Sequence, residues 1–274
     1  MQAMKRKDNN EYIIPDWPAP SWIKSAVSTR KKIGQNPYDS FNIAFHVNDD
    51  IAKVASNREQ LITDLSIINS PFWLEQVHGI NSIELLKDEN RQTDYSPANN
   101  SADNRQLNNL VRADASYTKQ KELPCVVMTA DCLPLFLTNK NGTWISAIHA
   151  GWRGLCKGIV ESTVAKYEGE SAELIAWLGP AISQTHFEVG AEVREAFLAV
   201  DKDYESGFKS HKPNYYMADL YFIARKKLSF LNIKSYGGDL CTFEDSERFY
   251  SYRRDAETGR MASLIWIEKR SEQK

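Results

Sequence analysis

Histidine and cysteine are scarce in this sequence, with five and four copies among 274 residues. The cysteines stand at positions 125, 132, 156 and 241, a spacing that matches neither a disulfide framework nor a Cys-x-x-Cys pair. Taken singly, each cysteine is expected to be a small buried apolar residue. Five histidines are too few for the several copper centres of a multi-site blue-copper oxidase. The sequence therefore predicts one metal site.

An excess of charge of either sign is also missing. The chain has 34 basic and 36 acidic residues and a net charge of −2, so charge gives no reason to expect nucleic acid or an anionic membrane as a partner. No apolar run approaches the ~18 residues of a membrane span, and the polar first ten residues do not resemble a secretory signal. With 42% hydrophobic and 26% charged residues, the sequence is typical of a soluble globular protein, and we expect a cytoplasmic location.

The order of apolar and polar segments predicts one large domain. We interpret residues 1–20 as a loose N-terminal leader, residues 21–270 as a single catalytic domain, and the Asn-rich stretch 88–109 as an exposed loop within it. Expected elements are a strand and turn over 38–49, helices over 51–65 and 154–167, a helix after 188, another capped by Asp219, and a final strand over 261–267. Because strands and helices interleave without a regular βαβ order, the predicted fold class is α+β, with mixed sheets flanked by helices.

The clearest local signal is a β-hairpin. Two apolar runs, 133–138 and 143–148, flank Asn-Lys-Asn-Gly, which favours a tight turn. A four-residue loop places Cys132 directly opposite His149, whereas a loop of residues 141–142 places them one diagonal apart. Both registers keep the two side chains on one face, and directly opposed Cβ atoms lie about 5 Å apart. A thiolate and an imidazole at that distance can share a zinc ion or act as nucleophile and base, and the hairpin leaves both alternatives open.

Gly79 indicates a turn, which places His78 at the end of an element.

Two further candidate catalytic residues flank the hairpin in the sequence. Asp131 precedes Cys132 and is a candidate general acid or base, or else a carboxylate that holds backbone amides. Arg153 is a candidate catalytic and substrate-binding residue, because a guanidinium can bind phosphate through two hydrogen bonds; a surface salt bridge is its alternative role.

Two further residues are candidates for binding substrate. Gln76 stands two residues before His78, so in an extended segment both share one face, and the amide could bind a base or a sugar. Arg253 could line the pocket, although one of Arg253 and Arg254 could instead pair with Asp255.

Five segments carry a specific combined pattern: Leu-Glu-Gln-Val-His-Gly at 74–79, Ala-Asp-Ala-Ser-Tyr-Thr at 113–118, Val-Met-Thr-Ala-Asp-Cys-Leu-Pro-Leu at 127–135, Ala-Ile-His-Ala-Gly-Trp-Arg-Gly at 147–154 and Phe-Tyr-Ser-Tyr-Arg-Arg-Asp at 249–255. Together they resemble the YfiH-like laccase-domain family, whose members are also called polyphenol oxidase or purine nucleoside phosphorylase. The resemblance spans about residues 40–266. It implies a single α+β domain related to cysteine-hydrolase-like folds, and one zinc ion bound by His78, Cys132 and His149. Ala44 and Asn48 depart from it, because the family usually has Gly there.

The resemblance also implies an activity: cleavage of adenosine, inosine and methylthioadenosine by phosphate, with adenosine deamination. Purine nucleosides and phosphate are then the partners. Three nitrogen and sulfur ligands with an open fourth position are typical of a catalytic zinc site. The alternatives are a zinc-dependent amidase acting on a cell-wall precursor peptide, a copper-dependent polyphenol oxidase, a metal-free Cys132–His149 hydrolase, and a binding module without catalysis.

Overall fold

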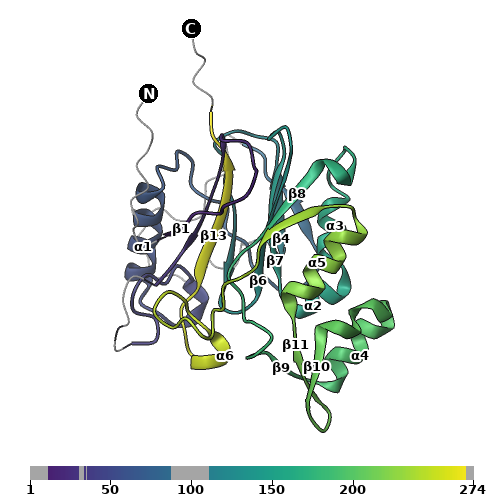
Figure 1. Cartoon of the computed structure of the whole chain (residues 1–274). Coiled ribbons are helices and arrows are strands. Elements are labelled where there is room, and N and C mark those ends of the chain that lie inside the picture. Colours follow the sequence, from purple (N-terminus) through teal and green to yellow (C-terminus); the bar gives the residue numbers. More distant parts are fainter. Residues whose placement is uncertain (1–11, 31–33, 35, 88–110, 270–274) are drawn as a thin grey trace.

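Two β-sheets form the centre of the computed structural model, which describes residues 12–30, 34, 36–87 and 111–269 (Figure 1). The first sheet has the strand order β1-β2-β13-β5 and the second β12-β8-β6-β7-β4-β3. The first is built from β1 (Tyr12–Ile13), β2 (Ile23–Ser28), β5 (Cys125–Thr129) and β13 (Met261–Ile267). The second is built from β3 (Ser82–Glu84), β4 (Ala115–Thr118), β6 (Leu133–Asn139), β7 (Ile145–Ala150), β8 (Leu174–Leu178) and β12 (Lys234–Gly237).

Helices cover the outer faces of the two sheets, which gives four layers in the order helix, sheet, sheet, helix (Figure 1). The helix on the four-stranded sheet is α1 (Ile51–Asp64), and those on the six-stranded sheet are α2 (Trp152–Lys157), α3 (Ile159–Val164) and α5 (Leu220–Phe230). A small sheet of β9 (Glu188–Gly190), β11 (Tyr215–Ala218) and β10 (Phe208–Lys212) packs with α4 (Ala191–Val200) at one end. The shorter helices are α6 (Tyr252–Asp255), η1 (Phe45–Val47), η3 (Ser171–Glu173) and η4 (Lys202–Gly207).

The central strands are apolar along their whole length because both of their faces are buried. Every residue of β5, β6 and β7 is buried. Side chains alternate between the faces, so Ala147 packs between the two sheets while Ile148 packs against the helices. His149 therefore shares its face with Ala147, at the end of the layer between the sheets.

The predicted fold class is confirmed: both mixed sheets and flanking helices are present. The final strand coincides with β13. The predicted helix after residue 50 is α1, whose first backbone N–H groups donate to the carboxylate of Asp50. Asp219 caps α5 in the same way by accepting a hydrogen bond from Phe222 N.

Two local predictions are wrong. Residues 38–49 form no strand; they contain η1, and Asn48 ends it with a φ of 62°, a conformation that asparagine tolerates better than most residues. The helix predicted over 154–167 is two short helices, because Gly158 has a φ of 96° and interrupts the hydrogen-bonded turns between α2 and α3.

The predicted leader over residues 1–20 is described only in part, because residues 1–11 lie outside the described residues. Tyr12 and Ile13 pair with β2, and Trp17 packs against the apolar layer between the main sheets. The loop predicted over 88–109 also lies outside the described residues. Among the helices that the structure describes, none combines the length and apolar content that crossing a membrane requires.

Candidate metal centre

The β6–β7 hairpin sets the register of the candidate site. Pro134 lies opposite His149, which is the register of the tight loop at residues 141–142. Continuing that register by two residues places Cys132 opposite Gly151, so Cys132 and His149 are diagonal neighbours. The alternative four-residue register, with the two directly opposed, is wrong.

Three predicted ligands converge at this end of the hairpin. His78 Nε2 lies 3.8 Å from Cys132 Sγ, and the rings of His78 and His149 meet edge to face with centroids 4.8 Å apart. One ligand atom from each residue lies within 4.8 Å of the other two. His149 is buried, Cys132 half-buried and His78 exposed, so the cluster opens to solvent on the His78 side.

The segment before His78 comes from outside the two main sheets and is fixed by a buried carboxylate. His78 has a φ of 57° and lies in a bend between elements. This position confirms the prediction that His78 stands at the end of an element. Asp114 accepts hydrogen bonds from His78 N at 2.8 Å and Gly79 N at 2.6 Å. Because Asp114 directly precedes β4, these bonds tie the bend to the start of that strand in the six-stranded sheet.

Asp114 also orients the ring of His149, a role that the sequence analysis missed. Its Oδ1 accepts a hydrogen bond of 2.8 Å from His149 Nδ1, and its backbone oxygen accepts one of 2.7 Å from His149 N. With Nδ1 engaged, Nε2 is the ring nitrogen left to bind a metal, and a carboxylate behind a metal-binding histidine commonly fixes it in this way. A single carboxylate between Ala113 and Ala115, at the start of an apolar segment, is the signal that could have identified it.

Gly151 leaves the space that an ion between these side chains needs. A Cβ built on Gly151 would lie 2.9 Å from Cys132 Sγ and 3.0 Å from His78 Cδ2. Any side chain at this position would therefore collide with two of the three ligands. The glycine of the His-Ala-Gly-Trp-Arg-Gly segment thus has a steric role at the site.

The three residues fit a zinc ion. Zinc bonds of about 2.3 Å to sulfur and about 2.0 Å to nitrogen at tetrahedral angles place those ligand atoms ~3.5 Å apart. The 3.8 Å between Cys132 Sγ and His78 Nε2 is close to that spacing. Three ligands and an open side leave a fourth position for another group, as in catalytic zinc sites.

Electrostatics favours the anionic thiolate that a metal requires. Burial by itself would raise the pKa of Cys132, but the charge of His149 and hydrogen bonds from both histidines lower it by more. Burial would lower the pKa of His149, and the Cys132 charge and the Asp114 hydrogen bond raise it by more. Hydrogen bonds from His149 and the backbone likewise outweigh burial and lower the pKa of Asp114. Both shifts favour a thiolate on Cys132 and a protonated His149 in the metal-free protein.

Asp131 and Gln76 lie near the cluster, but their polar atoms contact other parts of the protein. Asp131, at a kink with a φ of 87°, accepts hydrogen bonds of 2.6 Å from Thr242 Oγ1 and from Arg253 N. The Gln76 amide donates to Met128 O at 2.8 Å and accepts from Met128 N at 2.7 Å. Both therefore hold backbone in place.

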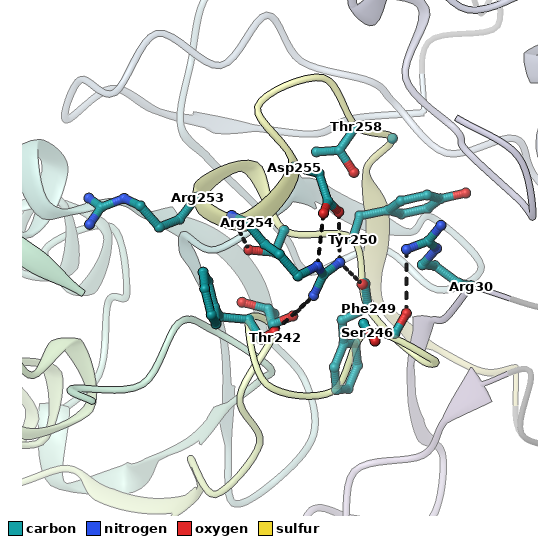
Figure 2. Close-up of polar contacts among 12 residues, drawn as sticks. Arg30, Thr242, Ser246, Phe249, Tyr250, Arg253, Arg254, Asp255 and Thr258 are labelled. Carbon is teal, nitrogen blue, oxygen red and sulfur yellow. Dashed lines mark hydrogen bonds and ion pairs between the residues drawn. The ribbon is translucent and has the colours of Figure 1, made fainter. Parts of the chain in front are cut away.

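The two candidate anion-binding arginines differ in their surroundings. Arg153 is exposed, and its guanidinium lies 4.3 Å from the ring centroid of Trp152. Among the described residues, Arg153 makes no ion pair. The Arg253 guanidinium donates to Glu188 O at 2.8 Å, toward β9. The arginine that pairs with Asp255 is Arg254 (Figure 2).

Arg260 is a cation near the cluster that the sequence analysis did not single out. Burial lowers its pKa, and the negative charges of Cys132 and Asp131 oppose that effect. Its guanidinium donates to Thr258 O at 2.7 Å and Gly259 O at 3.0 Å. An arginine directly before the last buried strand is the signal that could have identified it.

Several known proteins are similar to this chain over nearly its whole length. The model of the family described as multi-copper polyphenol oxidoreductase laccase matches residues 24–268. The protein named purine nucleoside phosphorylase YfiH of Escherichia coli K12 is 43% identical over 260 residues, which cover 94% of this chain and 99% of that one. A purine nucleoside phosphorylase of Pseudomonas aeruginosa is 42% identical over 262 residues, again 94% of this chain and 99% of the relative.

Solved structures share the fold. A Neisseria meningitidis protein has a TM-score of 0.83 and 36% identity, covering 94% of this chain and 100% of its own. A Bacillus licheniformis protein has a TM-score of 0.82 at 23% identity, covering 96% of this chain and 98% of its own, which is a likeness of fold alone. These structures agree with the single mixed α/β domain, whereas the relation to cysteine-hydrolase-like folds stays a prediction.

Proposed function

This chain belongs to the multi-copper polyphenol oxidoreductase laccase family, as its sequence motifs predicted, and from that premise we propose that it is a zinc-dependent purine nucleoside phosphorylase. The names of its relatives support the reaction. The observation that carries the proposal is the convergence of His78, Cys132 and His149 on one solvent-accessible point. Two nitrogens and one sulfur favour zinc, and copper is the alternative ion.

In this proposal, three side chains bind the ion and other residues position those three ligands. His78 Nε2, His149 Nε2 and the Cys132 thiolate would bind zinc, which as a Lewis acid polarises an oxygen bound to it. Asp114 keeps the His149 ring in one tautomer and fixes the bend that carries His78. Gly151 keeps the space between the ligands free.

Phosphate needs positive charge beside the sugar, and two arginines supply it in this proposal. Arg260 carries its charge close to Cys132, and Arg153 stands two residues after Gly151 with no carboxylate partner among the described residues. Guanidinium groups bind phosphate oxygens in pairs of hydrogen bonds. In the reaction, a phosphate oxygen bonds to ribose C1′ as the bond from C1′ to the purine breaks. The products are ribose 1-phosphate and the free base, which takes up a proton.

Asp131, Gln76 and Arg253 serve as positioning residues in this proposal. Asp131 holds the turn that carries Cys132 against Arg253 N, and Gln76 holds the bend before His78 against β5. Their polar atoms are already engaged, which supports a structural role over acid–base catalysis or contact with the nucleoside. The Arg253 side chain is directed to β9.

The test is phosphate dependence. Zinc-loaded protein is incubated with inosine, adenosine or methylthioadenosine, with and without phosphate. The free base and the sugar 1-phosphate are measured, which is ribose 1-phosphate for the first two substrates and 5-methylthioribose 1-phosphate for the third. We expect both products only when phosphate is present, and a raised KM for phosphate in Arg153→Gln and Arg260→Gln. The matched control is Arg194→Gln, which removes an arginine of α4 that is paired with Glu205. Base release at an equal rate without phosphate contradicts the proposal, and inosine formed from adenosine measures deamination.

The lowered pKa of Cys132 and the raised pKa of His149 support one second candidate, a metal-free hydrolase in which His149 is the base that takes the thiol proton and the Cys132 thiolate is the nucleophile. Metal analysis separates the two. The phosphorylase requires zinc for turnover, so full activity in zinc-free protein supports the hydrolase. Turnover of a phenol by protein loaded with copper in place of zinc tests the polyphenol oxidase alternative.

A further inference from the structure

A second group of metal-ligating side chains lies outside the site described above. His186, Cys241 and Glu244 each place one ligand atom within 4.8 Å of the other two. None of them belongs to the first cluster, and histidine count alone had predicted one site. We propose that these three residues form a second site for a thiophilic divalent cation, zinc in the first instance, which ties two loops together.

The two loops already run side by side in the backbone. Ala181 and Cys241 form an isolated parallel bridge, in which Thr242 N donates to Ala181 O at 3.0 Å. His186 stands on the first loop, in a turn closed by a hydrogen bond of 3.1 Å from its N–H to Ser183 O. The three ligands thus come from backbone that is fixed by hydrogen bonds, although 54 intervening residues separate His186 from Cys241.

Cys241 is arranged to act as an electron-pair donor. Ser183 donates two hydrogen bonds to its Sγ, from the backbone N at 3.4 Å and from Oγ at 3.0 Å. These two hydrogen bonds fix the position of the sulfur beside the ligand atoms of His186 and Glu244. The same pattern, hydrogen bonds around a ligating atom, tunes and orients known metal ligands.

Of the other two proposed ligands, His186 is held in place by packing and Glu244 has a carboxylate that is not engaged by another described residue. The His186 ring stacks on Phe243 with centroids 4.4 Å apart and an interplanar angle of 16°, which limits its rotation. Within the described part of the chain, no ion pair or hydrogen bond engages the exposed Glu244 carboxylate. One nitrogen, one sulfur and one carboxylate oxygen form a donor set that zinc accepts, with a fourth position for water.

The surroundings favour a cation. Cys241 and Glu244 line a surface pocket of about 590 Å³ that also contains the carboxylates of Asp239, Asp245 and Glu247. The one basic residue lining this pocket, Arg248, is paired with Asp245. The uncompensated charge around the proposed ligands is therefore negative, which raises the local concentration of cations.

Arg254 also holds the loop that contains Cys241 and Glu244. Its guanidinium donates to Thr242 O at 2.9 Å, Phe243 O at 3.0 Å and Phe249 O at 2.9 Å, and pairs with Asp255 (Figure 2). Thr242 in turn donates to Asp131, the neighbour of Cys132. A cation bound at Cys241 would reinforce a loop that supports the turn of the first site, without sharing a ligand with it.

The test is a titration of the full chain, freed of metal, with Co²⁺ and then Zn²⁺. Cobalt bound to a thiolate gives a near-ultraviolet charge-transfer band, so each site is visible by its cysteine. We expect the wild type to bind about two ions, and Cys132→Ser and Cys241→Ser about one each, with a thiolate band remaining in both. His186→Ala is expected to weaken the second binding event at least tenfold.

Matched controls separate ligation from loss of structure. Cys156→Ser and His211→Ala remove residues of the same types outside both clusters and are expected to leave two binding events. Circular dichroism of the metal-free variants checks folding; if Cys241→Ser does not fold, His186→Ala and Glu244→Gln decide by loss of the second event. A Cys241→Ser or His186→Ala isotherm equal to that of the wild type overturns the proposal. So does the absence of any thiolate–cobalt band in folded Cys132→Ser.

Discussion

The carboxylate of Asp114 accepts a hydrogen bond of 2.8 Å from Nδ1 of His149, and both side chains are buried. The same carboxylate accepts backbone N–H groups from the bend at His78, so one side chain orients one ligand and positions the segment of another. Because Asp114 is fully buried, no water competes for these bonds. Metal affinity should therefore depend on a residue that touches no metal.

Asp114→Asn tests this dependence. The amide keeps the size of the side chain but removes its charge, so the hydrogen bond to His149 and those to the bend weaken. We expect zinc affinity to fall about 10- to 100-fold, as for other carboxylates behind metal-binding histidines. Competition with a chromophoric chelator measures it. Asp203→Asn, which removes a surface carboxylate paired with Lys226, should leave affinity unchanged; equal affinity in both variants contradicts the role given to Asp114.

Gly151→Ala tests the space between the ligands. Its Cβ would lie 2.9 Å from Cys132 Sγ, so either the thiolate or the ion must move. We expect zinc binding at the first site to be lost or weakened by at least tenfold, with the fold retained, as seen by calorimetry and circular dichroism. Gly79→Ala is the matched control next to His78, because its Cβ would meet ordinary contacts at 3.4 Å and 3.6 Å. A Gly151→Ala protein with wild-type affinity would show that the ion lies elsewhere.

Local features of this chain could be predicted from the sequence because they depend on neighbouring residues. The period-two apolar runs and the Asn-Gly turn set the β6–β7 hairpin, and thereby placed Cys132 and His149 on one face. The caps at Asp50 and Asp219 followed from side chains that reach backbone within three residues. Gly158 shows the limit of periodicity, since apolar spacing continues across a break that one positive φ creates.

Contacts between distant segments could not be predicted from local patterns. Nothing in the residues around His78 shows that a carboxylate 36 positions later fixes its bend, and only the family resemblance brought His78 into the ligand set. The second cluster depends on the bridge between Ala181 and Cys241, which no spacing rule indicates. The polar atoms of Gln76 and Asp131 likewise contact backbone that the sequence does not place beside them.

Gln76→Leu separates a positioning role from a substrate-binding one. β5 is an edge strand of its sheet, and Gln76 satisfies both the N–H and the C=O of Met128 at that edge. Leucine leaves both groups without their partner, so the free energy of unfolding should fall by about 1–3 kcal/mol in chemical denaturation. Gln120→Leu, which removes one exposed hydrogen bond to Lys87 N, should cost less. A raised KM for inosine with unchanged stability would instead assign Gln76 to the substrate.

The pH dependence of alkylation tests the paired charges of Cys132 and His149. Burial raises the pKa of Cys132, but the charge of His149 and the hydrogen bonds from both histidines together lower it by more, so metal-free protein should carry a thiolate at neutral pH. As the pH is lowered, the rate of Cys132 alkylation by iodoacetamide should fall only at pH values below the pKa of an ordinary thiol, which is about 8.5. Burial raises the pKa of Cys125 to about 12, so Cys125 should not react over the same range. Peptide mass spectrometry from pH 5 to 9 resolves the sites, and zinc should protect Cys132. If the rate for Cys132 is half-maximal at a pH equal to or above the pKa of a free thiol, the charge pair is contradicted. Equal rates with and without zinc contradict the use of Cys132 as a metal ligand.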